Sequence, residues 1–196
     1  MGYSLDPIAD NCYPETTVLI NKLNIMDEAL LNEVEATLVS AKTAIWENNP
    51  LYNTFDFAHY KAIHSFLFED LYDWAGHVRT VDISKQGTRF SPHEEIDDLS
   101  NRIFSRLRKR KLFRKLDRKE FLSEILDFYC ITNHLHPFRE GNGRTQRIFV
   151  TQLIHNAGYM FDFADVDGDL LMIATIQSAN GVKDLLKELF DQLLPE

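Results

Sequence analysis

The chain has 196 residues, of which 44% are hydrophobic and 26% charged, a composition typical of one folded globular domain. It contains no window of 18 uncharged apolar residues, which excludes a transmembrane helix. Asp6 and Asp10 fall where a signal peptide would need a basic flank and an apolar run. Two cysteines, Cys12 and Cys130, are too few for a disulfide framework, so we expect reduced thiols and a cytoplasmic protein.

Charge is distributed unevenly along the chain. The net charge is −9, yet residues 102–119 hold ten basic residues and one acid, Asp117. Such a cluster is compatible with a nucleic acid, an acidic protein partner or a solvated helix end. No helix-turn-helix, zinc finger or aromatic stacking motif accompanies it, so a nucleic-acid partner is the least favoured of the three.

The hydrophobic pattern predicts an all-α protein, with an irregular segment over residues 1–22 and one domain over residues 23–193. The first helix should bury Leu30, Leu31, Val34, Leu38 and Ala41. The first predicted helix is capped by Asp27 and ends before Pro50, and a second is capped by Asp56. A third begins with a capping box at Ser91 and ends near Arg108, and a fourth begins at Asp117 and runs through Leu135. The last three cover about Asn142 to Gly158, 169–178 and 181–193.

Residues 78–90 differ from this helical background. Val78, Val81 and Ile83 are β-branched, and Gln86-Gly87 supplies a turn before the chain returns. A single hairpin is marginal as an independent structure. We therefore interpret it as a flap that covers another part of the molecule.

Residues 133–147 carry the chemistry, because they place reactive side chains on a tight turn between two helices. Gly141 and Gly143 let backbone N–H groups at a helix N-terminus approach an anion such as a phosphate. Arg144 and Arg147 are three residues apart and can bind the same polyphosphate. His136 can take a proton from an attacking hydroxyl. These are the parts of a phosphoryl- or nucleotidyl-transfer site.

Glu140 lies beside this predicted phosphate site, where a bridging Mg²⁺ would remove the charge repulsion. The two common nucleotide motifs are absent, since the chain has no GxxxxGK[ST] and Gln146 stands at the third glycine of GxGxxG. His134 and His136 have the spacing of metal ligands, but further His or Cys residues are missing nearby, so zinc is disfavoured.

Residues 136–147 match in full the signature HxFx(D/E)GNGRxxR, and the chain therefore resembles the Fic family. The resemblance extends to Asp73-Trp74-Ala75-Gly76, to the flap over 83–90 and to Ser178-Ala179-Asn180, and covers about residues 20–192. It implies the Fic fold, a helical bundle with a small β-hairpin flap over the active-site loop.

The resemblance also implies an activity, the transfer of AMP from ATP to a hydroxyl side chain of a target protein with release of pyrophosphate. His136 would be the catalytic base, and Glu140 would hold Mg²⁺. In the flap, Lys85 and Phe90 would bind the target as an added strand. The nucleotide would be bound by Ile83, Ser84, Lys85, Glu140, Gly141, Asn142, Gly143, Arg144, Arg147 and Asn180.

Two alternatives remain for the activity: a Fic enzyme that transfers another phosphate-containing group, and a catalytically weak module held in a regulatory complex. Fic proteins are commonly inhibited by a helix bearing (S/T)xxxE(G/N), whose glutamate pairs with the second motif arginine, here Arg147. The chain has one match, at residues 43–48, with Glu47 as its glutamate. Because that match lies at the end of a predicted core helix, we favour inhibition by a small separate antitoxin-like protein.

Overall fold

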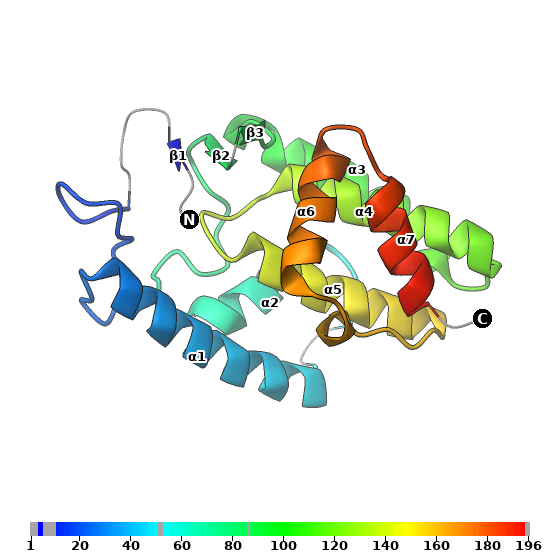
Figure 1. Ribbon diagram of the computed structural model, residues 1–196, viewed down its shortest axis with the longest axis horizontal. Helices are drawn as coiled ribbons and strands as arrows, with labels where there is room; N and C mark the ends of the chain where they lie inside the picture. Colours follow the sequence, from blue (N-terminus) through cyan, green and yellow to red (C-terminus); the bar gives the residue numbers. More distant parts are fainter. Residues whose placement is uncertain (1–3, 6–10, 51–52, 86, 195–196) are drawn as a thin grey trace.

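The computed structural model describes residues 4–5, 11–50, 53–85 and 87–194 and shows a helical bundle with a small sheet at one side (Figure 1). The predicted all-α class is confirmed. The helices are α1 (Glu28–Asn48), α2 (Phe57–Phe68), α3 (Ile96–Lys109), α4 (Arg118–Leu135), α5 (Asn142–Ala157), α6 (Gly168–Ala179) and α7 (Asp184–Leu193). The strands are β1 (Ser4–Leu5), β2 (Ile83–Lys85) and β3 (Thr88–Arg89), and the short 3₁₀ helices are η1 (His93–Glu95), η2 (Lys111–Phe113) and η3 (Phe163–Asp165).

Three of the predicted helix starts are confirmed by side-chain caps. The carboxylates of Asp27, Asp56 and Asp117 each accept a hydrogen bond of 2.8 Å from a backbone N–H three residues on. The capping box predicted at Ser91 is wrong. The hydroxyl of Ser91 donates instead to the carbonyl of His134 at 3.1 Å, and the carboxylate of Asp82 accepts from the N–H of His93, the first residue of the 3₁₀ turn, at 2.7 Å.

The core lies between α4 and α5, which contact each other, while α2 packs on α5 and α7 packs on α4 (Figure 1). Phe128 of α4 and Phe149 of α5 are both buried, with their rings stacked at 5.8 Å. Burial of one such ring stabilises the fold by roughly 1.5 to 3 kcal/mol. The side chain of Gln146 ties the two helices further by donating to the backbone carbonyl of Tyr129 at 2.7 Å. The motif turn therefore joins two helices that pack directly on each other in the core.

The buried face of α1 differs from the predicted stripe. Leu30 is 48% exposed and Ala41 is exposed, whereas Leu31 and Val39 are buried as expected of an amphipathic helix. Between them Glu35 is also buried, although it is charged. The buried face is thus rotated relative to the predicted stripe, and the Glu35 carboxylate has partners in the protein interior, described below.

The sheet is antiparallel with the order β1-β2-β3. The flap strands are shorter than predicted, since Val78 and Val81 lie outside them, and Gln86 lies outside the described residues. The prediction that residues 1–22 are irregular is wrong at β1, whose Ser4 and Leu5 pair with Ser84 and Ile83 of the flap. A strand from the start of the chain thus lies along one edge of β2.

The basic cluster of residues 102–119 is largely a paired and solvated surface. Arg106, Arg110 and Arg118 form ion pairs of 2.7 Å with Glu124, Glu120 and Asp191. These contacts hold the α3–α4 connection against neighbouring helices, which supports the reading as a solvated helix end. Within the described ranges, no helix is long and apolar enough to cross a membrane.

Candidate active site

The turn that joins α4 to α5 is held by its own side chains. The amide of Asn142 accepts from the N–H of Phe138 at 2.8 Å and donates to its carbonyl at 2.7 Å. Phe138 is fully buried, and its ring stacks on His64 with centroids 3.8 Å apart. Asn142 is 3% exposed and absent from the lining of the cavity described below, so its side chain shapes the turn.

Two residues outside the turn support it from beneath. Arg79 donates from Nε to the carbonyl of His136 at 2.9 Å, and its N–H donates to Pro137 at the same distance. His64 accepts from the N–H of Gly76 at Nδ1 and therefore donates from Nε2 to the carbonyl of Glu140, 3.0 Å away. These contacts fix the backbone at both ends of the motif turn.

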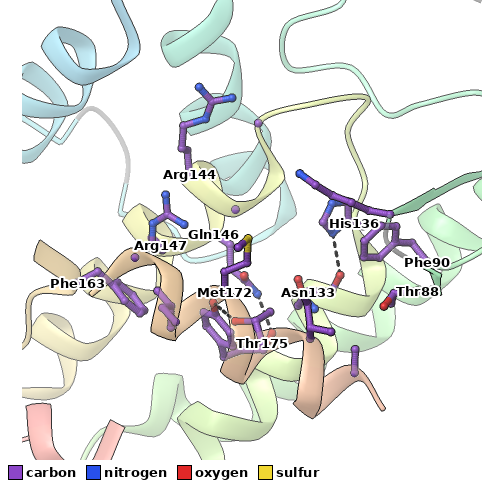
Figure 2. A pocket seen from close by; sticks show the side chains of 18 of the residues that line it. Thr88, Phe90, Asn133, His136, Arg144, Gln146, Arg147, Phe163, Met172 and Thr175 are labelled. Atoms are coloured by element: carbon purple, nitrogen blue, oxygen red, sulfur yellow. Dashed lines mark hydrogen bonds between the residues drawn. The ribbon is translucent and has the colours of Figure 1, made fainter. Parts of the chain in front are cut away.

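His136 caps α4 in a left-handed conformation, with φ of 43°. Its Nδ1 lies 3.0 Å from the carbonyl oxygen of Asn133 (Figure 2). Because a carbonyl only accepts, Nδ1 carries the proton and Nε2 keeps its lone pair. Burial lowers the pKa of His136 to about 3, with further lowering by Arg79 and Lys85. The imidazole is therefore neutral at physiological pH and able to accept a proton at Nε2.

The N-terminus of α5 presents backbone N–H groups beside His136. The first intrahelical bond runs from Thr145 N to Gly141 O, which leaves the N–H groups of Asn142, Gly143 and Arg144 without a helical partner. Gly141 has φ of 78°, and a Cβ there would lie 2.3 Å from the ring of Phe68. Glycine is required at this position by both conformation and space, and the result is an anion site at a helix dipole.

Arg144 and Arg147 project from the first turns of α5 (Figure 2). Arg144 is bound by Glu35 of α1 through Nη2 at 2.5 Å and lies 3.5 Å from Glu140. Arg147 forms no ion pair with any described residue, and Phe163 lies beside it in the cavity wall. Burial lowers the pKa of Arg147, and Arg144 contributes to that lowering. Arg144 is thus fixed by an ion pair, whereas Arg147 has no ion pair among the described residues.

His136, Glu140, Gly141, Gly143, Arg144 and Arg147 line one cavity of about 580 Å³, together with Lys85 and Phe90 of the flap. Ile83 and Ser84 are absent from its lining. So is Asn180, which is exposed and donates from its amide to the carbonyl of Ile176 at 2.9 Å. The structure brings together most of the predicted site residues, but Ile83, Ser84, Asn180 and the side chain of Asn142 lie outside the cavity lining.

The far wall of the cavity was missed by the sequence reasoning. Phe163 of η3 and Met172, Thr175 and Ile176 of α6 form an apolar surface opposite α5 (Figure 2). The sequence signal was that Leu170, Leu171, Met172 and Ile173 make α6 apolar on all sides without a clear stripe. A helix apolar all round has a second surface to cover in addition to its core face.

The residues around Glu140 fit a Mg²⁺ ion that is bound partly by nucleotide phosphates better than a metal ion bound by protein side chains alone. In the part of the chain that the structure describes, no three His, Cys, Asp or Glu side chains cluster for metal binding. Oε1 of Glu140 accepts from the N–H of Gly141 at 2.8 Å, which aims the carboxylate at the N-terminus of α5. Mg²⁺ commonly binds one or two carboxylates and completes its shell with phosphate oxygens and water.

A second cavity of about 550 Å³ lies on the other side of the arginines, between α1 and α5. Glu47, Arg144 and Arg147 all line it, yet Glu47 forms no ion pair with Arg147 among the described residues. Burial raises the pKa of Glu47, and Asp162 raises it further. The self-inhibitory contact that the residue 43–48 match would require is not made.

The model of the Fic/DOC family matches residues 54–154, and the chain belongs to this family. It is 38% identical over 193 residues to the protein adenylyltransferase VbhT of Bartonella schoenbuchensis, covering 98% of this chain and 40% of that protein. It is 37% identical over 179 residues to the probable protein adenylyltransferase y4lH of Sinorhizobium fredii, covering 90% and 89% of the two chains. This chain thus spans less than half of VbhT but most of y4lH.

Solved structures agree with the fold. The BepC protein of Bartonella tribocorum with bound AMPPNP superposes with a TM-score of 0.86 at 26% identity, covering 94% of this chain and 96% of that one. The N-terminal Fic domain of a putative cell filamentation protein from Bartonella quintana, with bound ADP, gives 0.87 at 26% identity, covering 94% of both chains. Both similar structures hold an adenine nucleotide.

Proposed function

We propose that this protein transfers AMP from ATP to a hydroxyl side chain of a target protein and releases pyrophosphate. The observation that carries the proposal is the neutral, buried His136 in the same cavity as the anion site at the N-terminus of α5. The names of the relatives, protein adenylyltransferases at 37% and 38% identity, support it.

The reaction uses these groups as follows. Nε2 of His136 takes the proton of the target hydroxyl as its oxygen attacks the α-phosphorus of ATP. The bond between the α-phosphorus and the bridging oxygen breaks, and pyrophosphate leaves. The N–H groups of Asn142 and Gly143 and the dipole of α5 stabilise the negative charge on the phosphate oxygens.

Arg144 and Arg147 bind the β- and γ-phosphates in this proposal, and Glu140 is the residue that would hold Mg²⁺. The ion would supply charge neutralisation for the leaving pyrophosphate. Arg147 has no ion pair among the described residues, and Arg144 keeps N–H donors beyond the nitrogen that Glu35 binds, so both can meet a phosphate.

For the adenine we propose the apolar wall formed by Phe163 and Met172. Asn180 reaches the base in this proposal once its amide releases the carbonyl of Ile176. Ile83 and Ser84 contribute through the backbone of β2, which carries Lys85 into the cavity.

The flap aligns the target segment as an added strand, with Lys85 and Phe90 nearest to the reacting groups. In the structure β1 already pairs with one edge of β2. A target strand therefore displaces β1 or uses the edge of β3.

We propose that restraint comes from a small antitoxin-like protein whose glutamate pairs with Arg147. Arg147 lines the cavity between α1 and α5 and forms no ion pair among the described residues, so a glutamate that enters this cavity can reach it. An incoming carboxylate at Arg147 would exclude the γ-phosphate by charge and volume.

We propose further that residues 23–193 act as one Fic domain and that the protein works in the cytoplasm, where ATP is available and where Cys12 and Cys130 stay reduced. Both cysteines are free in the structure.

The test is incubation of the protein with labelled ATP and a cell lysate, with His136→Ala as the matched control. Labelled protein bands with the wild type alone support AMP transfer. Absence of label with ATP and Mg²⁺ would favour a non-catalytic module, and label supplied only by another nucleotide would favour transfer of a different group.

A further inference from the structure

Glu35 is a charged residue on the buried face of α1, only 8% exposed. Both of its carboxylate oxygens are bound. Oε1 accepts from Nη2 of Arg144 at 2.5 Å, and Oε2 accepts from the hydroxyl of Tyr72 at 2.5 Å. A buried carboxylate is tolerated only with such partners, because burial of an unpaired charge is strongly unfavourable.

Tyr72 is itself fixed in position. It is 1% exposed, and its ring stacks on Trp74 with centroids 4.4 Å apart. Burial and the negative charge of Glu35 raise the pKa of Tyr72, so the hydroxyl stays protonated and donates to the carboxylate. Tyr72 thereby fixes the direction from which Glu35 meets Arg144.

Arg144 is held from three sides. Glu35 binds Nη2, the ring of Phe68 lies 4.8 Å from the guanidinium carbon, and Glu140 lies 3.5 Å away. The contact to Glu35 uses one nitrogen of a guanidinium that has five N–H donors in a rigid plane. The remaining donors are available to an anion in the cavity that Arg144 lines.

Arg147, one turn further along α5, provides the contrast. It has no ion pair within the described part of the chain. Its Nη1 lies 3.4 Å from the point that a Cβ would occupy if Gly143 were replaced by another residue. Of the two arginines, only Arg144 is preorganised by a carboxylate from another helix. Preorganisation increases affinity by removing the entropy cost of ordering a side chain on binding.

We infer that Glu35 is a positioning residue for nucleotide binding: with Tyr72 it holds the guanidinium of Arg144 in the orientation in which its free N–H groups meet the phosphates. The inference rests on the proposed function, since it takes ATP as the ligand. It means that α1, a helix outside the signature, helps to form the phosphate site by holding Arg144.

The first experiment measures AMPPNP affinity by calorimetry, and KM for ATP and kcat, for Glu35→Gln and for the matched control Glu33→Gln, an exposed residue on the same helix. We expect Glu35→Gln to weaken AMPPNP binding and raise KM for ATP by about tenfold, with kcat within about twofold and the control unchanged. Tyr72→Phe keeps the stack on Trp74 and should cause a smaller loss in the same direction.

The second experiment is a double-mutant cycle. If Glu35 acts through Arg144, Glu35→Gln adds no further loss of AMPPNP affinity in an Arg144→Gln background. Thermal melting of each variant identifies those that fail to fold, and Tyr72→Phe then carries the test. Wild-type affinity in Glu35→Gln and Tyr72→Phe, tighter binding in either, or additive losses in the cycle would overturn the inference. Wild-type protein that neither binds AMPPNP nor transfers label would instead overturn the proposed function.

Discussion

The ring of Phe90 lies almost parallel to the imidazole of His136, with centroids 3.6 Å apart and an interplanar angle of 12°. This contact joins the end of the flap to the residue proposed as the base, and both residues line the same cavity. His136 is consequently well packed and only 6% exposed. The flap shields the base from water and, in our proposal, presents the hydroxyl to it.

The flap should matter more for the target than for the nucleotide. Lys85→Ala and Phe90→Ala are each expected to reduce labelling of target protein by about tenfold or more and to weaken AMPPNP binding by much less, because strand addition places the target here. Quantitative labelling beside calorimetry checks this. Equal losses in both assays would show that the hairpin belongs to the nucleotide site.

The buried imidazole of His136 predicts a pH dependence of stability. Its pKa is about 3 in the folded protein and about 6.5 in the unfolded chain, so below pH 6.5 the unfolded chain binds the proton and the folded protein does not. Above pH 6.5 His136 does not change the unfolding free energy with pH. Between pH 6.5 and pH 3 the unfolding free energy falls by about 1.4 kcal/mol for each pH unit of acidification.

Urea unfolding at several pH values, with His136→Ala as reference, measures this effect. The variant lacks the imidazole and should lose less stability on acidification. The difference in unfolding free energy between wild type and His136→Ala should therefore shrink by about 1.4 kcal/mol per pH unit. A gap that stays constant between pH 7 and pH 5 would show that the imidazole is protonated freely in the folded protein.

Glu140→Gln should raise the Mg²⁺ concentration needed for half-maximal transfer and lower turnover. The amide keeps the size of the side chain but loses the charge that a hard cation prefers. Transfer measured across a Mg²⁺ titration provides the test, and wild-type activity that persists in excess chelator would exclude the proposed ion.

Glu47→Gly should leave AMP transfer by the isolated chain unchanged, because Glu47 makes no ion pair with Arg147 among the described residues. This expectation also follows from our proposal that a separate protein, and not Glu47, inhibits the enzyme. The comparison is the rate of labelling with and without the substitution. A large rise in the variant would show that the chain inhibits itself through this glutamate.

Much of the fold was accessible from local sequence signals. The aspartate caps at Asp27, Asp56 and Asp117 are short-range, and the structure confirms them. Ser91 shows the limit, because its hydroxyl prefers a carbonyl 43 residues away over its own helix end. The pairing of β1 with the flap is long-range as well, and nothing in residues 1–22 indicated it.

The candidate site divides in the same way. Residues 136–147 are contiguous, so their signature was sufficient to place His136, Gly141 and Arg147 around one cavity. Glu35 and Phe163 reach that region from other helices, and the sequence pattern did not single out either of them. Such contacts depend on packing angles that hydrophobic periodicity alone does not determine.

The position of the label on ATP distinguishes transfer of AMP from transfer of a phosphate group. Parallel reactions use ATP labelled at the α- or at the γ-phosphate, each with wild type and with His136→Ala. We expect protein-bound label from the α position only, reduced about 10²- to 10⁴-fold in His136→Ala. Label from the γ position, or equal labelling by wild type and His136→Ala, would show that the protein does not transfer AMP by the proposed mechanism.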